Sequence, residues 1–135
     1  MRFFLFADGA SRGNPGPAGA GVVLKDREGH VVAEKSQFLG RMTNNEAEYR
    51  ALLLGFAAAR EHIKDKGATL VCLMDSQLVV FQVKGLYKIK APHLRELLTK
   101  VKIEERGFTT VLYKLIPREK NARADELANE ALGKR

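Results

Sequence analysis

The sequence predicts an α/β fold in which a five-stranded mixed sheet carries helices on both faces. Two segments, residues 2–8 and 68–75, are apolar at almost every position, which is typical of central strands buried on both sides. Residues 43–62 instead carry apolar side chains at helical spacing, and Thr43 followed by Glu46 matches a capping box. The resulting element order is βββαβααβα, and we expect a single domain over residues 1–135.

The remaining elements follow from turn signals and shorter patterns. Residues 9–21 are rich in Gly and Pro and predict a dense turn. Residues 22–39 predict two strands joined by a turn at 26–29. Helices are expected at 76–83, 92–105 and 121–132, with a basic loop at 84–90 and a last strand at 108–116.

Charge and composition limit the classes of function. The net charge is +7, from 23 basic and 16 acidic residues, so a polyanionic partner and a merely soluble basic protein are both compatible with it. No apolar stretch approaches the roughly 20 residues needed to span a bilayer, and no signal peptide is visible. Cys72 is alone, which excludes a disulfide framework. We therefore expect a cytosolic protein without a membrane partner.

Four acidic residues lie at the edges of apolar segments, and they are the main candidates for chemistry. Asp8 and Asp75 each end an apolar strand, Glu48 lies in the first predicted helix, and Asp125 lies near the start of the last helix. Each could be a simple cap or helix-dipole partner. If they converge, two like charges 4 Å apart repel by roughly 4 kcal/mol at an effective dielectric of 20. Such a cluster favours Mg²⁺ or Mn²⁺, which prefer oxygen ligands.

Helical periodicity separates the two glutamates of the first helix. On a helical wheel Glu48 shares a face with Leu52 and Phe56, whereas Glu46 lies almost opposite, beside Arg50. A carboxylate on the core side needs a partner or a metal, so Glu48 is the functional candidate. Near the C-terminus the choice between Asp125 and Glu126 stays open on this reasoning, because both suit the first turn of a helix.

Other kinds of site find little support. The scattered residues His30, His62 and His93 have no zinc-ligand spacing relative to Cys72. No serine has the surroundings of a catalytic nucleophile, and the Gly-rich segment matches neither a dinucleotide-binding nor a P-loop motif.

Four segments together resemble the type 1 ribonuclease H family, in the order of that family and over essentially the whole chain. They are FADGASRGNPGPAGAGVVL, TNNEAEYRALLLGF, MDSQLVVFQVKG and REKNARADELANEAL. The resemblance implies a ribonuclease H-like fold. It also implies an endonuclease that hydrolyses the RNA strand of RNA–DNA hybrids with two Mg²⁺ ions (Mn²⁺ as a possible substitute), giving 5′-phosphate and 3′-hydroxyl ends.

By the same resemblance, the catalytic and metal-binding acids would be Asp8, Glu48, Asp75 and Asp125. Contacts to the hybrid backbone and its 2′-hydroxyls would come from Ser11 and Asn14, and contacts to the minor groove from Asn44, Asn45 and Gln77. Arg41 and Thr43 match the family's site for a DNA-strand phosphate. Asn14 is also a good turn former, and Thr43 already serves as a helix cap.

The chain departs from many family members at two places. The segment KLIPREKNARAD holds no histidine before Asp125, and Arg118 is the nearest substitute, ahead of Glu119 and Lys120. The basic, Trp-bearing handle is also absent, so that hybrid binding would either be weaker or rest on Lys84, Lys88, Lys90 and Tyr87. This compact pattern resembles archaeal-like and some bacterial members. We expect a monomer with no obligate protein partner.

Two alternatives belong to other classes of protein. A non-catalytic nucleic-acid-binding module could share the fold, although it would have no reason to keep four mutually repelling acids. The DGASRG segment also resembles the phosphate motif of actin-like ATPases, but these need two domains and 135 residues leave no room for a second.

Overall fold

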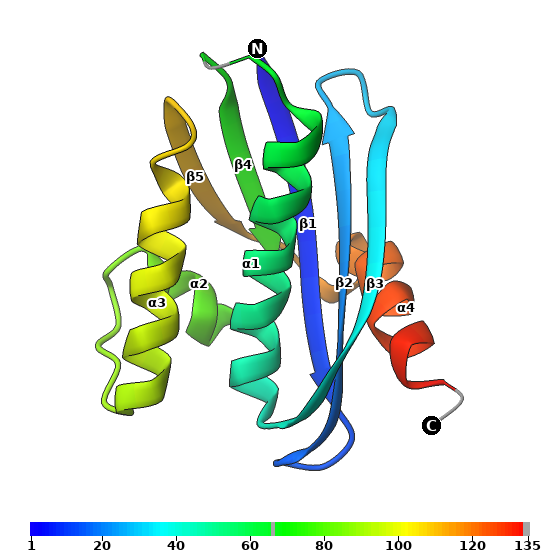
Figure 1. The fold of residues 1–135 in the computed structure, drawn as a ribbon, viewed down its shortest axis with the longest axis vertical. Coiled ribbons are helices and arrows are strands. Elements are labelled where there is room, and N and C mark those ends of the chain that lie inside the picture. The colour runs from blue at the N-terminus through cyan, green and yellow to red at the C-terminus, as the bar shows by residue number, and fades with distance from the viewer. Residues whose placement is uncertain (66, 134–135) are drawn as a thin grey trace.

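The computed structural model describes residues 1–65 and 67–133, and its centre is a five-stranded sheet with strand order β3-β2-β1-β4-β5 (Figure 1). β1, β2 and β3 are antiparallel neighbours, whereas β4 and β5 run parallel to β1. The elements in chain order are β1 (Arg2–Ser11), β2 (Gly16–Asp26), β3 (Val31–Met42), α1 (Asn44–His62), β4 (Thr69–Met74), α2 (Gln77–Val83), α3 (Pro92–Glu105), β5 (Thr110–Leu115), the 3₁₀ helix η1 (Arg118–Asn121) and α4 (Ala122–Leu132). The predicted mixed sheet and its element order are confirmed, with η1 as an addition that the sequence did not indicate.

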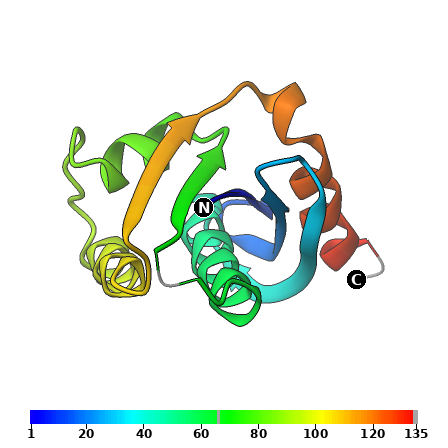
Figure 2. The same cartoon turned by 90° about the horizontal axis from the view of Figure 1, so that it is seen from above.

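Helices cover both faces of the sheet. α1 packs against β1, β2 and α3, whereas α4 packs against β1, β2 and β3. Figure 2 shows α1 and α3 on one side of the twisted sheet and α4 on the other. The main apolar core lies between α1, α3 and the sheet, and its largest fully buried side chains include Leu5, Tyr49, Phe56 and Leu70. No helix among residues 1–65 and 67–133 is long and apolar enough to cross a membrane.

The Gly-rich segment after Asp8 is mostly strand, which corrects the predicted dense turn. β1 continues through Asp8 to Ser11, and β2 already begins at Gly16, so that the turn is confined to residues 12–15. The two strands pair continuously from Phe3 opposite Asp26 to Ser11 opposite Ala18. The small residues of this segment therefore serve a purpose other than chain reversal.

That purpose is the close approach of two helices to the sheet. A Cβ atom on Gly9 would lie 2.2 Å from the carbonyl oxygen of Ala47 in α1. A Cβ atom on Gly21 would lie 2.2 Å from the carbonyl oxygen of Ala124 in α4. Gly21 pairs with Asp8, the neighbour of Gly9, and adjacent residues of a strand face opposite sides. The two glycines thus admit helix backbones on opposite faces of the sheet, next to Asp8.

We expect Gly21→Ala to destabilise the protein by about 3 kcal/mol or more, because the new methyl group would meet backbone atoms of α4 that cannot rotate away. The measurement is urea unfolding. Gly67→Ala is the control, since its Cβ would only touch the Asp65 side chain at 3.4 Å, and its effect should stay within about 1 kcal/mol. Equal stabilities of the two variants would contradict the close-approach argument.

Candidate active site

Two candidate acids are brought together by strands of unequal length. β4 ends at Met74, so that Asp75 is the first residue after it. The pairing of β1 with β4 stops at Phe6 opposite Leu73, and β1 runs on past this point through Asp8. The sequence suggested that Asp8 ends its strand, but Asp8 lies within β1. It nevertheless lies beyond the end of the neighbouring parallel strand. The carboxyl ends of parallel strands are a usual place for ligand sites.

Glu48 joins the two aspartates from α1. One carboxylate oxygen from each of Asp8, Glu48 and Asp75 lies within 4.8 Å of the others. Asp8 and Glu48 are only 7% and 6% exposed, so water screens their repulsion poorly. The helical wheel thus chose the inward-facing glutamate. Glu46 forms the capping box with Thr43, whose backbone N donates to Glu46 Oε1 at 3.1 Å. Its ion-pair partner is His93, at 4.0 Å, and not Arg50, beside which the helical wheel places it.

Asp125 approaches the same place from the other face of the sheet. It follows Ala124, whose carbonyl oxygen lies against Gly21, and its interaction with the Asp8 side chain raises the pKa of Asp8. A cavity of about 240 Å³ is lined by Asp8, Glu48, Asp75, Asp125 and Arg118, together with Gly9, Ala10 and Asn44. The neighbouring Glu126 is exposed and pairs with Arg123 at 3.3 Å, so that the structure separates two residues between which the sequence could not choose.

The electrostatics of the cluster fit a divalent cation. Burial, followed by the charge of Asp75 and a hydrogen bond with Asp125, raises the pKa of Asp8 to about 8. Burial raises the pKa of Glu48 to about 7, against the opposing effect of a hydrogen bond from Ser76, and burial also raises the pKa of Asp75. Without a cation, Asp8 and Glu48 therefore retain protons near neutral pH. A set of oxygen donors with this much unfavourable charge suits Mg²⁺ or Mn²⁺.

Two asparagines support the cluster, and the sequence analysis missed both. Asn121 is 1% exposed, and its Nδ2 donates to the carbonyl oxygen of Ala7 at 3.0 Å and hydrogen-bonds to the Asp75 side chain. It thereby fastens the segment before Asp125 to β1 and β4. Asn129 donates to the carbonyl oxygen of Asp125 at 2.9 Å and to its Oδ1 at 3.3 Å. The spacing of four residues from Asp125 was the available signal for Asn129.

We call the candidate substrate residues the rim, and three of them are hydrogen-bonded to one another next to this cavity, which Asn44 lines. Asn44 N donates to Asn14 Oδ1 at 3.0 Å, Ser11 N donates to Asn44 Oδ1 at 3.3 Å, and Asn44 Nδ2 donates to Glu48 Oε1 at 3.4 Å. The turn after β1 is thus linked through Asn44 to a carboxylate of the cluster. Asn45 is half-buried in the first turn of α1.

The other rim residues come from the ends of neighbouring elements. Arg41 is exposed near the end of β3, opposite Pro17 in β2. The Thr43 hydroxyl is engaged by Glu46 in the capping box, at 3.0 Å. Gln77 is exposed as the first residue of α2, two positions after Asp75.

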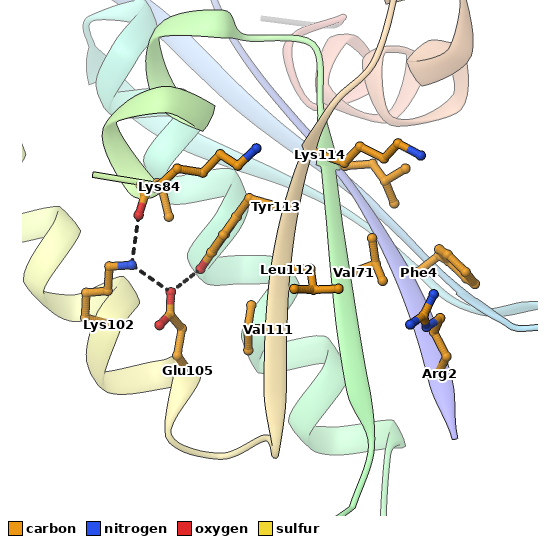
Figure 3. Close-up of a pocket in the computed structure, with 12 residues that line it drawn as sticks. Arg2, Phe4, Val71, Lys84, Lys102, Glu105, Val111, Leu112, Tyr113 and Lys114 are labelled. Atoms are coloured by element: carbon orange, nitrogen blue, oxygen red, sulfur yellow. Dashed lines mark hydrogen bonds and ion pairs between the residues drawn. The ribbon is translucent and has the colours of Figure 1, made fainter. Parts of the chain in front are cut away.

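A larger cavity, of about 630 Å³, lies elsewhere, around β5 and the neighbouring parts of β1, β4, α2 and α3 (Figure 3). Its one carboxylate, Glu105, accepts hydrogen bonds from the Tyr113 hydroxyl at 2.6 Å and from Lys102 at 3.2 Å. Lys102 also donates to the carbonyl oxygen of Val83 at 2.8 Å. These groups satisfy one another, and they tie α3 to α2 and β5. We regard the cluster as structural.

Comparisons with known proteins agree with the fold. A family profile described as Reverse transcriptase-like matches residues 6–131. The crystal structure of RNase H1 from Halobacterium salinarum is 41% identical, with each chain covered completely and a TM-score of 0.95. The chain belongs to the type 1 ribonuclease H family. This confirms the predicted ribonuclease H-like fold and the resemblance read from the four segments.

Two curated relatives are longer than the chain. Ribonuclease HI of Halobacterium salinarum is 45% identical over 97% of this chain and 64% of its own length. A bifunctional protein of Mycobacterium tuberculosis is 43% identical over 98% of this chain and 36% of its own length. The chain thus spans between about a third and two thirds of these relatives. A further solved structure, LC11-RNase H1 in complex with an RNA/DNA hybrid, is 41% identical with a TM-score of 0.89, over 98% of this chain and 97% of that one.

We expect Asp8→Asn to stabilise the metal-free protein at about pH 8. The pKa of Asp8 is raised from 3.8 to about 8 on folding, so the folded state binds its proton more tightly and loses stability as pH rises across that range. Asparagine has no such proton to lose. The measurement is the melting temperature in chelator over a pH series, with Glu126→Gln as the exposed control.

Added Mg²⁺ should restore the stability that deprotonation removes. Its effect on the melting temperature of the unchanged protein should therefore be larger at about pH 8 than at about pH 6, and it should be much reduced in Asp8→Asn. Parallel pH profiles of the unchanged protein and Asp8→Asn would contradict the interpretation.

Proposed function

We propose that this chain is an endonuclease that hydrolyses the RNA strand of RNA–DNA hybrids and leaves 5′-phosphate and 3′-hydroxyl ends. The convergence of three carboxylates within 4.8 Å, in a chain with ribonuclease H relatives, is the observation that carries the proposal. The match to LC11-RNase H1, whose structure contains an RNA/DNA hybrid, supports the class of substrate. The net charge of +7 suits a polyanion of this kind.

The residues that would hold the cations are Asp8, Glu48, Asp75 and Asp125. Asp8 lies between the other acids and would contact both ions, with Glu48 and Asp75 completing one site and Asp125 the other. Two Mg²⁺ ions, or Mn²⁺ as a substitute, would supply Lewis-acid polarisation of the phosphodiester and neutralise the carboxylates. The chain's own part is to hold the oxygens in place beforehand, which the bonds of Asn121 and Asn129 favour.

The rim residues would orient the hybrid over this centre. Ser11 and Asn14 in the turn, with Asn44, Asn45 and Gln77 at two helix starts, offer hydroxyl, amide and backbone groups suited to 2′-hydroxyls and the minor groove. Arg41 is exposed and free to approach a DNA-strand phosphate. Thr43 would do so through its backbone or after exchanging its bond with Glu46. Discrimination between RNA and DNA would therefore come from this rim.

Arg118 has a position that suits the scissile phosphate. It lines the cavity of the acids, and its positive charge lowers the pKa of Asp75 against the larger effect of burial. A guanidinium does not give up its proton near neutral pH, so Arg118 cannot serve as a general base. We propose that it binds the phosphate during cleavage and product release, where other family members have a histidine.

A non-catalytic binding module on the same fold is the alternative from another class. It would gain nothing from a cluster in which burial and neighbouring charges raise the pKa values of Asp8, Glu48 and Asp75. Basic groups at their positions would serve nucleic-acid binding better. The expected monomer and the expected cytosolic location stay predictions from the sequence.

The test is cleavage of a labelled RNA–DNA hybrid in Mg²⁺ or Mn²⁺, beside duplex RNA and duplex DNA. We expect hybrid cleavage that chelator abolishes and that Asp8→Asn, Glu48→Gln or Asp125→Asn reduces by about 100-fold or more, since each removes a charged ligand. Glu126→Gln, one residue from Asp125 and exposed, should keep full activity. Hybrid binding without metal-dependent cleavage would favour the binding module.

We expect Arg118→Ala to lower kcat by about 10-fold or more and to change KM much less, because Arg118 lines the cavity of the acids, where the reacting phosphate would bind. Arg118→Lys should recover only part of the rate, since it lacks the planar pair of donors. Steady-state kinetics on the hybrid measure this. A rise in KM at constant kcat would make Arg118 a simple phosphate contact of the ground state.

A further inference from the structure

The segment after α2 folds back along that helix and returns to the rim of the site. Gly85 has φ +83°, which a residue with a side chain rarely adopts, and it reverses the chain. Leu86 N and Tyr87 N then both donate to the carbonyl oxygen of Phe81, at 2.8 and 3.1 Å. This doubling back carries Tyr87 toward the first residue of α2, although ten positions separate the two in sequence.

Tyr87 is held there by its ring and meets Gln77 with its hydroxyl. The ring stands edge to face against Phe81, with centroids 5.1 Å apart and an interplanar angle of 90°. The hydroxyl lies 3.2 Å from Nε2 of Gln77, in hydrogen-bond contact. Tyr87 is 41% exposed, so its hydroxyl is not needed to satisfy a buried polar group. An exposed pair held in register by a backbone reversal suggests a role toward a ligand.

The backbone of Gln77 is itself fixed relative to the acids. Ser76 caps α2 by accepting a hydrogen bond from Val79 N at 3.2 Å, and Asp75 directly precedes it. Only the Gln77 side chain is then free to rotate. A glutamine side chain that must be immobilised on binding weakens affinity, and immobilising it beforehand avoids that loss. The hydrogen bond that Gln77 Nε2 donates to the Tyr87 hydroxyl determines the direction in which the amide points.

We propose that Tyr87 is a positioning residue that orients the Gln77 amide for contact with the hybrid. The inference rests on the proposed hydrolysis of RNA–DNA hybrids. It adds a role in substrate binding for the loop after α2, which has no catalytic group. Tyr87 acts through Gln77 in the substrate complex, not on the acids or on the reacting phosphate. Its contribution therefore belongs to substrate binding, and the hydroxyl is the group responsible.

The test compares Tyr87→Phe, Gln77→Ala and the double variant in steady-state cleavage of the hybrid. Tyr87→Phe keeps the ring on Phe81 and removes only the hydroxyl, so we expect KM to rise about 3- to 10-fold at unchanged kcat. In the Gln77→Ala background the same change should have no further effect, because its partner is gone. The control is Tyr113→Phe, which removes the tyrosine hydroxyl bonded to Glu105 in the cavity around β5. It should lower the melting temperature and leave KM unchanged.

The outcomes distinguish a failure of the proposed function from a failure of the positioning role. If the unchanged protein does not cleave the hybrid, the proposed function fails, and this inference with it. If it does cleave, a KM of Tyr87→Phe equal to that of the unchanged protein overturns the positioning role alone. So does a full additional rise of KM in the Gln77→Ala background, which would mean that Tyr87 contacts the substrate by itself. A fall in kcat would likewise overturn the role, since Tyr87 does not reach the acids.

Discussion

The direct contact of two helix backbones with the sheet is the constraint on which the site depends. Gly9 follows Asp8 in β1, and Gly21 lies opposite Asp8 in β2. Each glycine admits a helix carbonyl, from an alanine that immediately precedes a candidate acid: Ala47 before Glu48 in α1, and Ala124 before Asp125 in α4. Two contacts on opposite faces therefore bring both helical carboxylates to one strand residue. Any side chain at either glycine would push an acid away from Asp8.

This arrangement explains what the sequence could and could not predict. The strands and helices were readable because the apolar periodicity of residues 2–8, 43–62 and 68–75 is strong, and the inward-facing glutamate followed from the same periodicity. The segment 9–21 was misread because glycine signals turns as well as close packing, and only the partner helix distinguishes the two. Asn121 was missed for a related reason, because its partners are remote in sequence.

The same closeness makes the cluster unfavourable until a cation binds. Asp8 and Glu48 are nearly buried, and their raised pKa values express the free energy of bringing like charges together away from water. Other parts of the fold must hold the acids in place against that repulsion. The capping box of α1, the Asn121 bond to β1 and the Asn129 bond to Asp125 all act at the ends of the elements that carry the acids. The cluster thus lowers the stability of the metal-free protein at the place where binding of a divalent cation would be most favourable.

The residues proposed to contact the hybrid are arranged differently, on exposed turns and helix starts, yet they are joined to the buried centre at a few points. Asn44 links the turn after β1 to Glu48, and Gln77 follows Asp75 within the capped start of α2. A hybrid bound at the rim would therefore contact residues that are linked to the carboxylates by a hydrogen bond or by the chain. A long basic handle could add affinity by charge alone, but it would not transmit position in this way. In the compact loop at 84–91, Tyr87 instead bonds to Gln77, which lies two residues after Asp75.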